Sequence, residues 1–196
     1  MTRTSSGHTL VELLIVTALM GTAAAIGLPR IRAGLDDAKT RTAAFYVSSR
    51  FALARTLAAQ RNANVAFRFE PEDSGIRVRA IVDTNGNGVL SSEIRSGIDV
   101  PILPDERLDH LFPGVRYGFV PDARLIDGTS VAPDDDPIRF GRSDMLTFSP
   151  SGTATSGTVY IRSRRTESQF AITVLGATGR TRISRFDAPN RRWIAP

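Results

Sequence analysis

Apolar residues follow two different patterns along this chain, an unbroken run near its start and a shorter alternation further on. From Thr9 to Leu28 the run holds twenty residues and one charge, Glu12. Twenty helical residues reach about 30 Å, the hydrocarbon thickness of a bilayer. The run is longer than the apolar core of a secretory signal, and no small-x-small cleavage site followed by a new polar start interrupts it. Residues 8–29 are therefore predicted to form a retained membrane-spanning segment.

An amphipathic helix is predicted to continue from residue 30 to residue 61. Pro29 is expected to kink the helix where the two parts meet. After it, apolar residues recur mostly at helical spacing, with charged residues between them. Asn62 and Asn64 are expected to end the helix. A helix of about fifty residues far exceeds the globular mean, so its second half is expected to pack on a sheet while its first half lies in a membrane or a filament.

From Val65 onward the apolar spacing changes to a period of two. Residues 65–69 and 76–82 alternate apolar with polar side chains, which is typical of half-buried antiparallel strands, and Ser74 and Gly75 form the expected turn between them. The segment 94–136 is irregular and predicts only loops and short strands. Further strands are predicted at 145–148, 157–162, 170–174 and 180–183.

Residues 62–196 are thus predicted to form a β-rich globular domain. The predicted fold class is α+β, with one long N-terminal helix packed on an antiparallel sheet.

Positive charge is concentrated at the end of the chain. The net charge is +5, and the last thirty-seven residues carry eight arginines against Glu167 and Asp187. The rest of the chain holds seventeen basic and eighteen acidic side chains, so the whole positive excess lies in that final part. Such asymmetry favours an anionic partner: nucleic acid, phospholipid headgroups or an acidic protein surface. Lys39 is the only lysine, so arginine supplies nearly every basic residue throughout the chain. The positions of the arginines are therefore evidence about function, but the choice of arginine over lysine is not.

Few residues suggest catalysis. The chain has no Cys, which excludes disulfides and thiolate metal sites, and only His8 and His110 offer an imidazole. It contains no nucleophile elbow, phosphate-binding glycine loop or paired-histidine metal motif. The chain is therefore not expected to be an enzyme, and a membrane-anchored enzyme or sensor is the least favoured hypothesis.

One segment starts like a calcium loop. Asp83, Asn85 and Asn87 place oxygen ligands at positions 1, 3 and 5, and Gly88 supplies the turn at position 6. The bidentate glutamate of such a loop belongs at position 12, but Glu93 falls one residue short of it. The alternative is a hairpin turn, for which Asn-Gly is the strongest short signal. The turn is the favoured interpretation, so no cofactor is expected, and calcium is the weaker candidate.

The first residues carry a resemblance to a known signal. A short polar leader with one positive charge ends at Gly7, and His8-Thr9-Leu10-Val11-Glu12 follows. This resembles the class III signal of type IV pilins and type II secretion pseudopilins, in which a residue that is usually Phe stands at the position of His8. The resemblance implies that a prepilin peptidase cleaves between Gly7 and His8 and removes residues 1–7, that His8 is N-methylated, and that Glu12 acts in assembly.

Glu12 is also a functional candidate on physical grounds, because a carboxylate inside an apolar helix is costly. The alternative is a side chain that only reaches the membrane interface.

Two further segments are similar to the GspH/FimT subgroup of that family. One is Ala52-Leu53-Ala54-Arg55, with Val65 opening the next strand. The other, Gly179-Arg180-Thr181-Arg182, resembles the Gly-Arg-x-Arg motif of FimT minor pilins, which bind DNA during natural transformation. The resemblance implies that Arg180 and Arg182 contact phosphates and that Gly179 shapes the turn presenting them.

Physical spacing is compatible with this role. In a strand, Arg180 and Arg182 point to one face about 7 Å apart, near the spacing of successive phosphates, and Arg185 extends the basic stretch. DNA binding of this kind would be salt-sensitive and indifferent to base sequence. The alternative is a strand edge protected by charge.

Two hypotheses follow within the family. The first is a FimT-like minor pilin that binds DNA for uptake, and the second is a GspH-like minor pseudopilin of a type II secretion system without DNA binding. Both imply a single-pass inner-membrane protein with a periplasmic domain that enters a pilus or pseudopilus. The implied partners are other pilins or pseudopilins, prepilin peptidase, an inner-membrane assembly platform and, in the first case, DNA.

Overall fold

The structure is a computed structural model that describes residues 9–141 and 143–196. It divides into two units between Leu35 and Asp36, inside the first helix. Gly7 and His8, the predicted cleavage and methylation sites, lie outside the described residues. The boundaries predicted for the leader and the membrane segment therefore stay predictions.

Helix α1 (Leu10–Arg61) has 52 residues. Thr9 caps its start, because the Thr9 Oγ1 accepts the backbone N–H of Glu12 at 3.3 Å, half of the Thr-x-x-Glu capping pattern. The helix continues through Pro29, and the kink predicted there stays a prediction. It ends where Asn62 adopts a left-handed φ of 49°, a conformation that Asn tolerates at helix ends. The predicted long helix is confirmed.

The first sheet is built on the predicted hairpin of β1 (Val65–Glu72) and β2 (Gly75–Val82), in which Glu72 pairs with Gly75. Its strand order is β3-β2-β1-β7, with β4 paired to β2, and every pairing is antiparallel. The remaining strands are β3 (Val100–Pro101), β4 (Glu106–Arg107) and β7 (Met145–Phe148).

The second sheet has the order β11-β10-β9-β8-β5, with β6 paired to β8, and is also antiparallel. Its strands are β5 (Val115–Tyr117), β6 (Ile138–Arg139), β8 (Gly157–Ser163), β9 (Gln169–Leu175), β10 (Arg180–Asp187) and β11 (Arg192–Ile194). Strand β11 pairs with β10 only from Arg185 to Asp187, so the first half of β10 forms an edge of this sheet.

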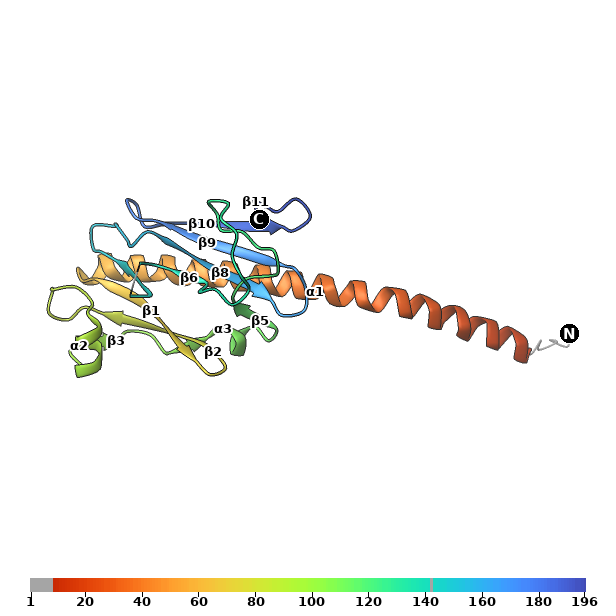
Figure 1. Ribbon diagram of the computed structural model, residues 1–196. Coiled ribbons are helices and arrows are strands. Elements are labelled where there is room, and N and C mark those ends of the chain that lie inside the picture. Colours follow the sequence, from red (N-terminus) through yellow and green to blue (C-terminus); the bar gives the residue numbers. More distant parts are fainter. Residues whose placement is uncertain (1–8, 142) are drawn as a thin grey trace, which may run out of the picture. The chain divides into compact units, whose positions relative to one another are not determined.

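The second half of α1 packs on both sheets, and strands of both lie alongside it (Figure 1). Its buried stripe consists mostly of small residues, which lets the sheets approach the helix closely: Ala43, Ala44, Val47, Phe51, Ala54 and Ala58. The one large side chain in this stripe is that of Phe51, whose ring contacts the rings of Phe67, Phe140 and Phe148. The predicted α+β fold, with a helix packed on antiparallel strands, is confirmed, with two sheets in place of one.

Two short helices were missed, α2 (Ser91–Ser96) and α3 (Leu108–Leu111). The position of α2 makes the hairpin interpretation of residues 83–88 wrong. The chain leaves β2 at Val82, passes through α2, and returns to pair with β2 only at Val100. The turn at 83–88 therefore opens a long connection and does not join two strands.

A second apolar cluster covers the face of the second sheet that lies away from α1. The loop after β5 places Phe119 against Tyr160, and Trp193 packs on Tyr160 and Phe186. The Trp193 Nε1–H donates to the backbone carbonyl of Arg124 at 2.9 Å, which fixes β11 to this loop.

Candidate functional site

Two regions hold the residues that the sequence singles out, the start of α1 and the start of β10. At the first, Glu12 lies in the first turn of α1, where a negative charge is favourable to the helix dipole. In the first unit, the large apolar side chains of α1 are not covered by other parts of the described chain. The helix is long and apolar enough to cross a membrane. Exposure of so many apolar side chains to water is unfavourable, and a bilayer or the helices of neighbouring subunits would bury them.

At the second region, strand alternation separates the three predicted arginines. Thr181 and Ile183 face α1: the hydroxyls of Thr181 and Ser48 lie 2.8 Å apart, and Ile183 packs on the main core. Arg180 and Arg182 therefore point to the opposite face, as predicted, and both are exposed. Arg185 is exposed too, but it shares the face of Thr181 and Ile183. The structure thus groups Arg180 with Arg182 and sets Arg185 apart.

Gly179 ends the turn between β9 and β10 in a conformation that favours glycine, with φ +59°. A Cβ at this position would lie 2.8 Å from the carbonyl oxygen of Gly152 and 3.2 Å from the Cδ of Arg55. Glycine is therefore needed both for its backbone angle and for the close approach. The predicted turn-shaping position of Gly179 agrees with this geometry, while its role in DNA binding stays a prediction.

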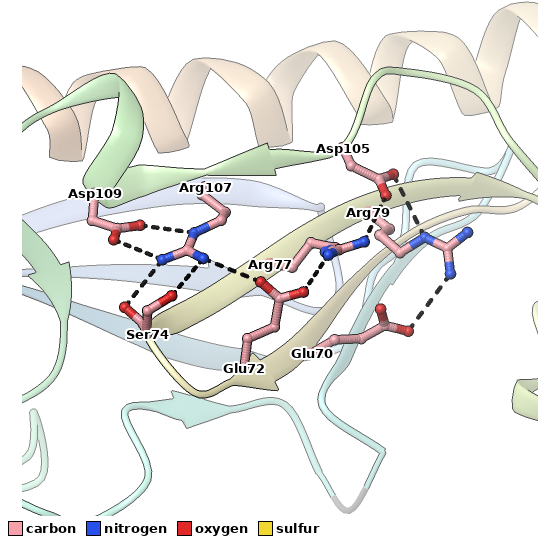
Figure 2. Close-up of polar contacts among 8 residues, drawn as sticks. All are labelled: Glu70, Glu72, Ser74, Arg77, Arg79, Asp105, Arg107 and Asp109. Atoms are coloured by element: carbon pink, nitrogen blue, oxygen red, sulfur yellow. Dashed lines mark hydrogen bonds and ion pairs between the residues drawn. The ribbon is translucent and has the colours of Figure 1, made fainter.

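The arginines of the first sheet differ from those of β10 because acidic side chains neutralise them. Figure 2 shows a network on β1, β2 and the residues around β4, in which Arg107 bonds Asp109 at 2.8 Å and Glu72 at 3.3 Å. Hydrogen bonds from Arg107 hold the pKa of Asp109 below its usual value. The other pairs are Arg77 with Glu72 and Asp105, and Arg79 with Glu70 and Asp105.

The arginines of β10 differ in this respect from those of the first sheet. Among residues 9–141 and 143–196, the side chains of Arg180, Arg182 and Arg185 make no ion pair or hydrogen bond. The positive charge of the β10 arginines is therefore available to an anionic partner, whereas acidic side chains compensate the positive charge on the first sheet.

The calcium-like segment folds around Asp83, which is 3% exposed. Its carboxylate accepts the backbone N–H groups of Asn85, Gly86 and Gly88 and the side-chain amide of Asn64. Burial alone would raise the pKa of Asp83, but these four hydrogen bonds outweigh it and lower the pKa. The side-chain amides of Asn85 and Asn87 both donate to the Oε1 of Glu93, at 3.1 and 2.8 Å. Hydrogen bonds from protein N–H groups to Asp83 and Glu93 thus stabilise the conformation of the loop, and calcium binding stays a proposal.

We predict that Asp83→Ala destabilises the second unit by about 2–4 kcal/mol, because four hydrogen bonds to a buried carboxylate are lost. The lowered pKa means that the ionised carboxylate stabilises the fold fully above about pH 4, and that this stabilisation is lost as the pH falls through the lowered pKa. Urea unfolding of the wild type and the variant between pH 7 and pH 3 measures both effects, and the difference in unfolding free energy between the two should shrink toward the acid end.

The exposed Asp127, which accepts a single N–H from Thr129 at 2.9 Å, is the matched control, and Asp127→Ala should cost far less. Equal stability with calcium and with a chelator is expected. A rise in Tm that needs both calcium and Asp83 would make the loop a cation site.

The remaining candidates offer little chemistry. His110 lies exposed at the end of α3. Within the described ranges, no group of three or more His, Cys, Asp or Glu side chains is placed to hold a metal ion.

Arg55 is the residue that sequence analysis missed as a site residue. It lies on α1, but its side chain contacts Gly152 and Gly179, which come from turns far along the chain. Its only sequence signal was its place in a segment similar to the GspH/FimT subgroup. Nothing in helical spacing alone indicates which turns it meets.

Comparisons with known proteins show a likeness in structure and none in sequence. No family model matches the chain, and no curated protein sequence matches it. The chain is similar to the solved structure of the minor pseudopilin EpsH from the type 2 secretion system of Vibrio cholerae, with 16% identity and a TM-score of 0.45. The match covers 74% of this chain and 95% of that one.

Proposed function

We propose that this chain is a minor, low-copy subunit of a type IV pilus or of a type II secretion pseudopilus. The observation that carries the proposal is the order of its parts: a class III-like signal ending at Gly7, an apolar helix of spanning length from Leu10, and a continuation of the same helix that is the spine of a β-rich unit. The first half of α1 anchors the subunit in the inner membrane, with the β-rich unit in the periplasm, until it enters a filament. Its role is structural and not enzymatic.

Glu12 is assigned the assembly role within this proposal. It lies in the first turn of an apolar helix, where a carboxylate is costly in a bilayer. A positive group on a neighbouring subunit, such as the amino terminus at His8, lowers that cost in the filament.

Processing of the leader tests the proposal. Expressed in a bacterium that has a prepilin peptidase, the membrane-extracted protein should lack residues 1–7 and carry one added methyl group on His8, as measured by intact mass. Gly7→Val is the control and should keep the whole leader. A wild-type protein that retains Met1–Gly7 or that is cut elsewhere would contradict the proposal.

A second function, DNA binding, is favoured by the exposed and uncompensated pair Arg180 and Arg182 on one face of β10. In this form the subunit is a FimT-like minor pilin for DNA uptake, and the arginines contact backbone phosphates without reading the base sequence. The alternative is a GspH-like minor pseudopilin, in which the same arginines meet a protein. Binding of duplex DNA by the wild type and by a variant lacking both arginines separates the two.

A further inference from the structure

A cavity of about 650 Å³ lies beside Gly179, between α1 and two turns of the β-rich unit. One wall is α1, with Ala52, Arg55 and Thr56, and the other is formed by the turns that contain Gly152 and Gly179. The two turns are tied together, because the Ala154 N–H donates to the carbonyl of Gly176 at 2.7 Å. The cavity is therefore built by three segments that are distant in sequence, two of which are joined by a backbone hydrogen bond.

The lining of this cavity is suited to an anion. Arg55 and Arg180 contribute positive charge, and the hydroxyl residues Thr56, Ser151 and Thr181 make the rest of the lining polar. The Thr56 hydroxyl donates to the carbonyl of Ala52, so the positive charge comes from the two arginines. None of the lining residues, all from the described part of the chain, is acidic. By contrast Arg50, one turn earlier on α1, is paired with Glu106 at 2.7 Å.

The guanidinium of Arg55 is exposed and directed at the turns. Its Nη2 lies 3.7 Å from the point where a Cβ of Gly152 would stand, and its Cδ and Nε lie 3.2 and 3.4 Å from the same point at Gly179. Within the described residues this side chain makes no ion pair or hydrogen bond. A guanidinium with its donors unused in an open cavity matches a phosphate group, which accepts several charge-assisted hydrogen bonds at once.

We propose that this cavity is a phosphate-binding site and that Arg55 is a third arginine of the DNA-binding surface, receiving a backbone phosphate beside the one at Arg180, which lines the same cavity. The proposal rests on the DNA-binding function proposed above. It adds a contact from α1 to a surface that the sequence places on β10 alone.

The test uses the full chain in a non-ionic detergent with a labelled DNA duplex across a salt series. Arg55→Gln should weaken binding roughly tenfold at low salt and reduce the slope of log affinity against log salt by about one, as expected for one lost phosphate contact. Arg55→Lys keeps the charge and should retain most of the affinity. Arg41→Gln is the matched control, since Arg41 lies on the same helix over the ring of Phe45 and outside the cavity, and it should bind like the wild type.

A second arm replaces DNA by inorganic phosphate at constant ionic strength and follows the amide NMR signals of Gly152 and Gly179. Shifts in the wild type that vanish in Arg55→Gln are expected. If phosphate produces these shifts but the wild type fails to bind DNA, the DNA function is wrong and the phosphate site stands.

If DNA binding depends on Arg180 and Arg182 but is unchanged in Arg55→Gln, the inference is overturned and the DNA function stands. Equal losses in Arg55→Gln and Arg55→Lys, with a lower Tm in both, would show that Arg55 only supports the turns, and would also overturn it.

Discussion

Phe51→Ala is expected to destabilise the β-rich unit by about 3–5 kcal/mol, the range for deleting a fully buried phenylalanine ring. Phe51 is 1% exposed, and its ring centroid lies 5.4, 6.3 and 6.4 Å from those of Phe67, Phe140 and Phe148. Its neighbours on the buried stripe of α1 are Val47 at 4% exposure and Ala54 and Ala58 at 0%, so no nearby side chain on the helix is large enough to fill the cavity left behind. Because a domain is stabilised by only about 5–15 kcal/mol in total, this one change removes a large share.

Urea unfolding of the full chain in detergent, followed by the fluorescence of Trp193, measures the loss. Phe45→Ala is the matched control on the same helix, since Phe45 is 46% exposed and should cost less than about 1 kcal/mol. Comparable losses for the two variants would mean that the second half of α1 is not docked on the sheets as the structure has it.

Local periodicity was sufficient to predict most elements of this fold. A period of two marked β1 and β2. A turn between them was expected at Ser74 and Gly75, but it consists of Asp73 and Ser74, because Gly75 already pairs with Glu72. Periodicity does not state which strands pair, and it could not show that β1 pairs with the distant β7 while β8 to β10 form a separate sheet. The mostly small buried residues of α1 let both sheets pack on the helix, and contacts between such distant segments leave no period in the sequence.

The connection after β2 shows how one side chain can change a turn. Asn-Gly favoured a hairpin on local statistics, but the carboxylate of Asp83 gathers the N–H groups of Asn85, Gly86 and Gly88. The chain then leads into α2, whose six residues are too few to show a helical period.

The candidate site was predictable from the sequence only where local strand geometry determines the direction of a side chain. Strand alternation correctly placed Arg180 and Arg182 on one face, and the same rule separates Arg185 from them, because Arg185 lies an odd number of residues, three, beyond Arg182. Arg55 could not be placed because its neighbours Gly152 and Gly179 come together only through the fold.

Arg180→Ala combined with Arg182→Ala is expected to weaken binding of duplex DNA by roughly 100-fold at low salt. Each charge-assisted contact to a phosphate contributes about 1.5 kcal/mol or more, and about 1.4 kcal/mol corresponds to a tenfold change in affinity. Because binding releases condensed counterions, the slope of log affinity against log salt should fall by about two when two phosphate contacts are lost. Fluorescence anisotropy with a labelled duplex, repeated with unrelated base sequences, measures both quantities and should show the same loss for each sequence.

The structure supplies a matched control of the same spacing and charge. Arg77 and Arg79 also lie two residues apart on a strand, but Glu70, Glu72 and Asp105 neutralise them (Figure 2). Arg77→Ala with Arg79→Ala should therefore leave both the affinity and the salt slope close to those of the wild type. If the two double variants lose affinity equally, binding follows net charge alone and no surface at β10 is responsible. If the wild type does not bind DNA even at low salt, the arginines of β10 have a protein partner, and the secretion pseudopilin is the better hypothesis.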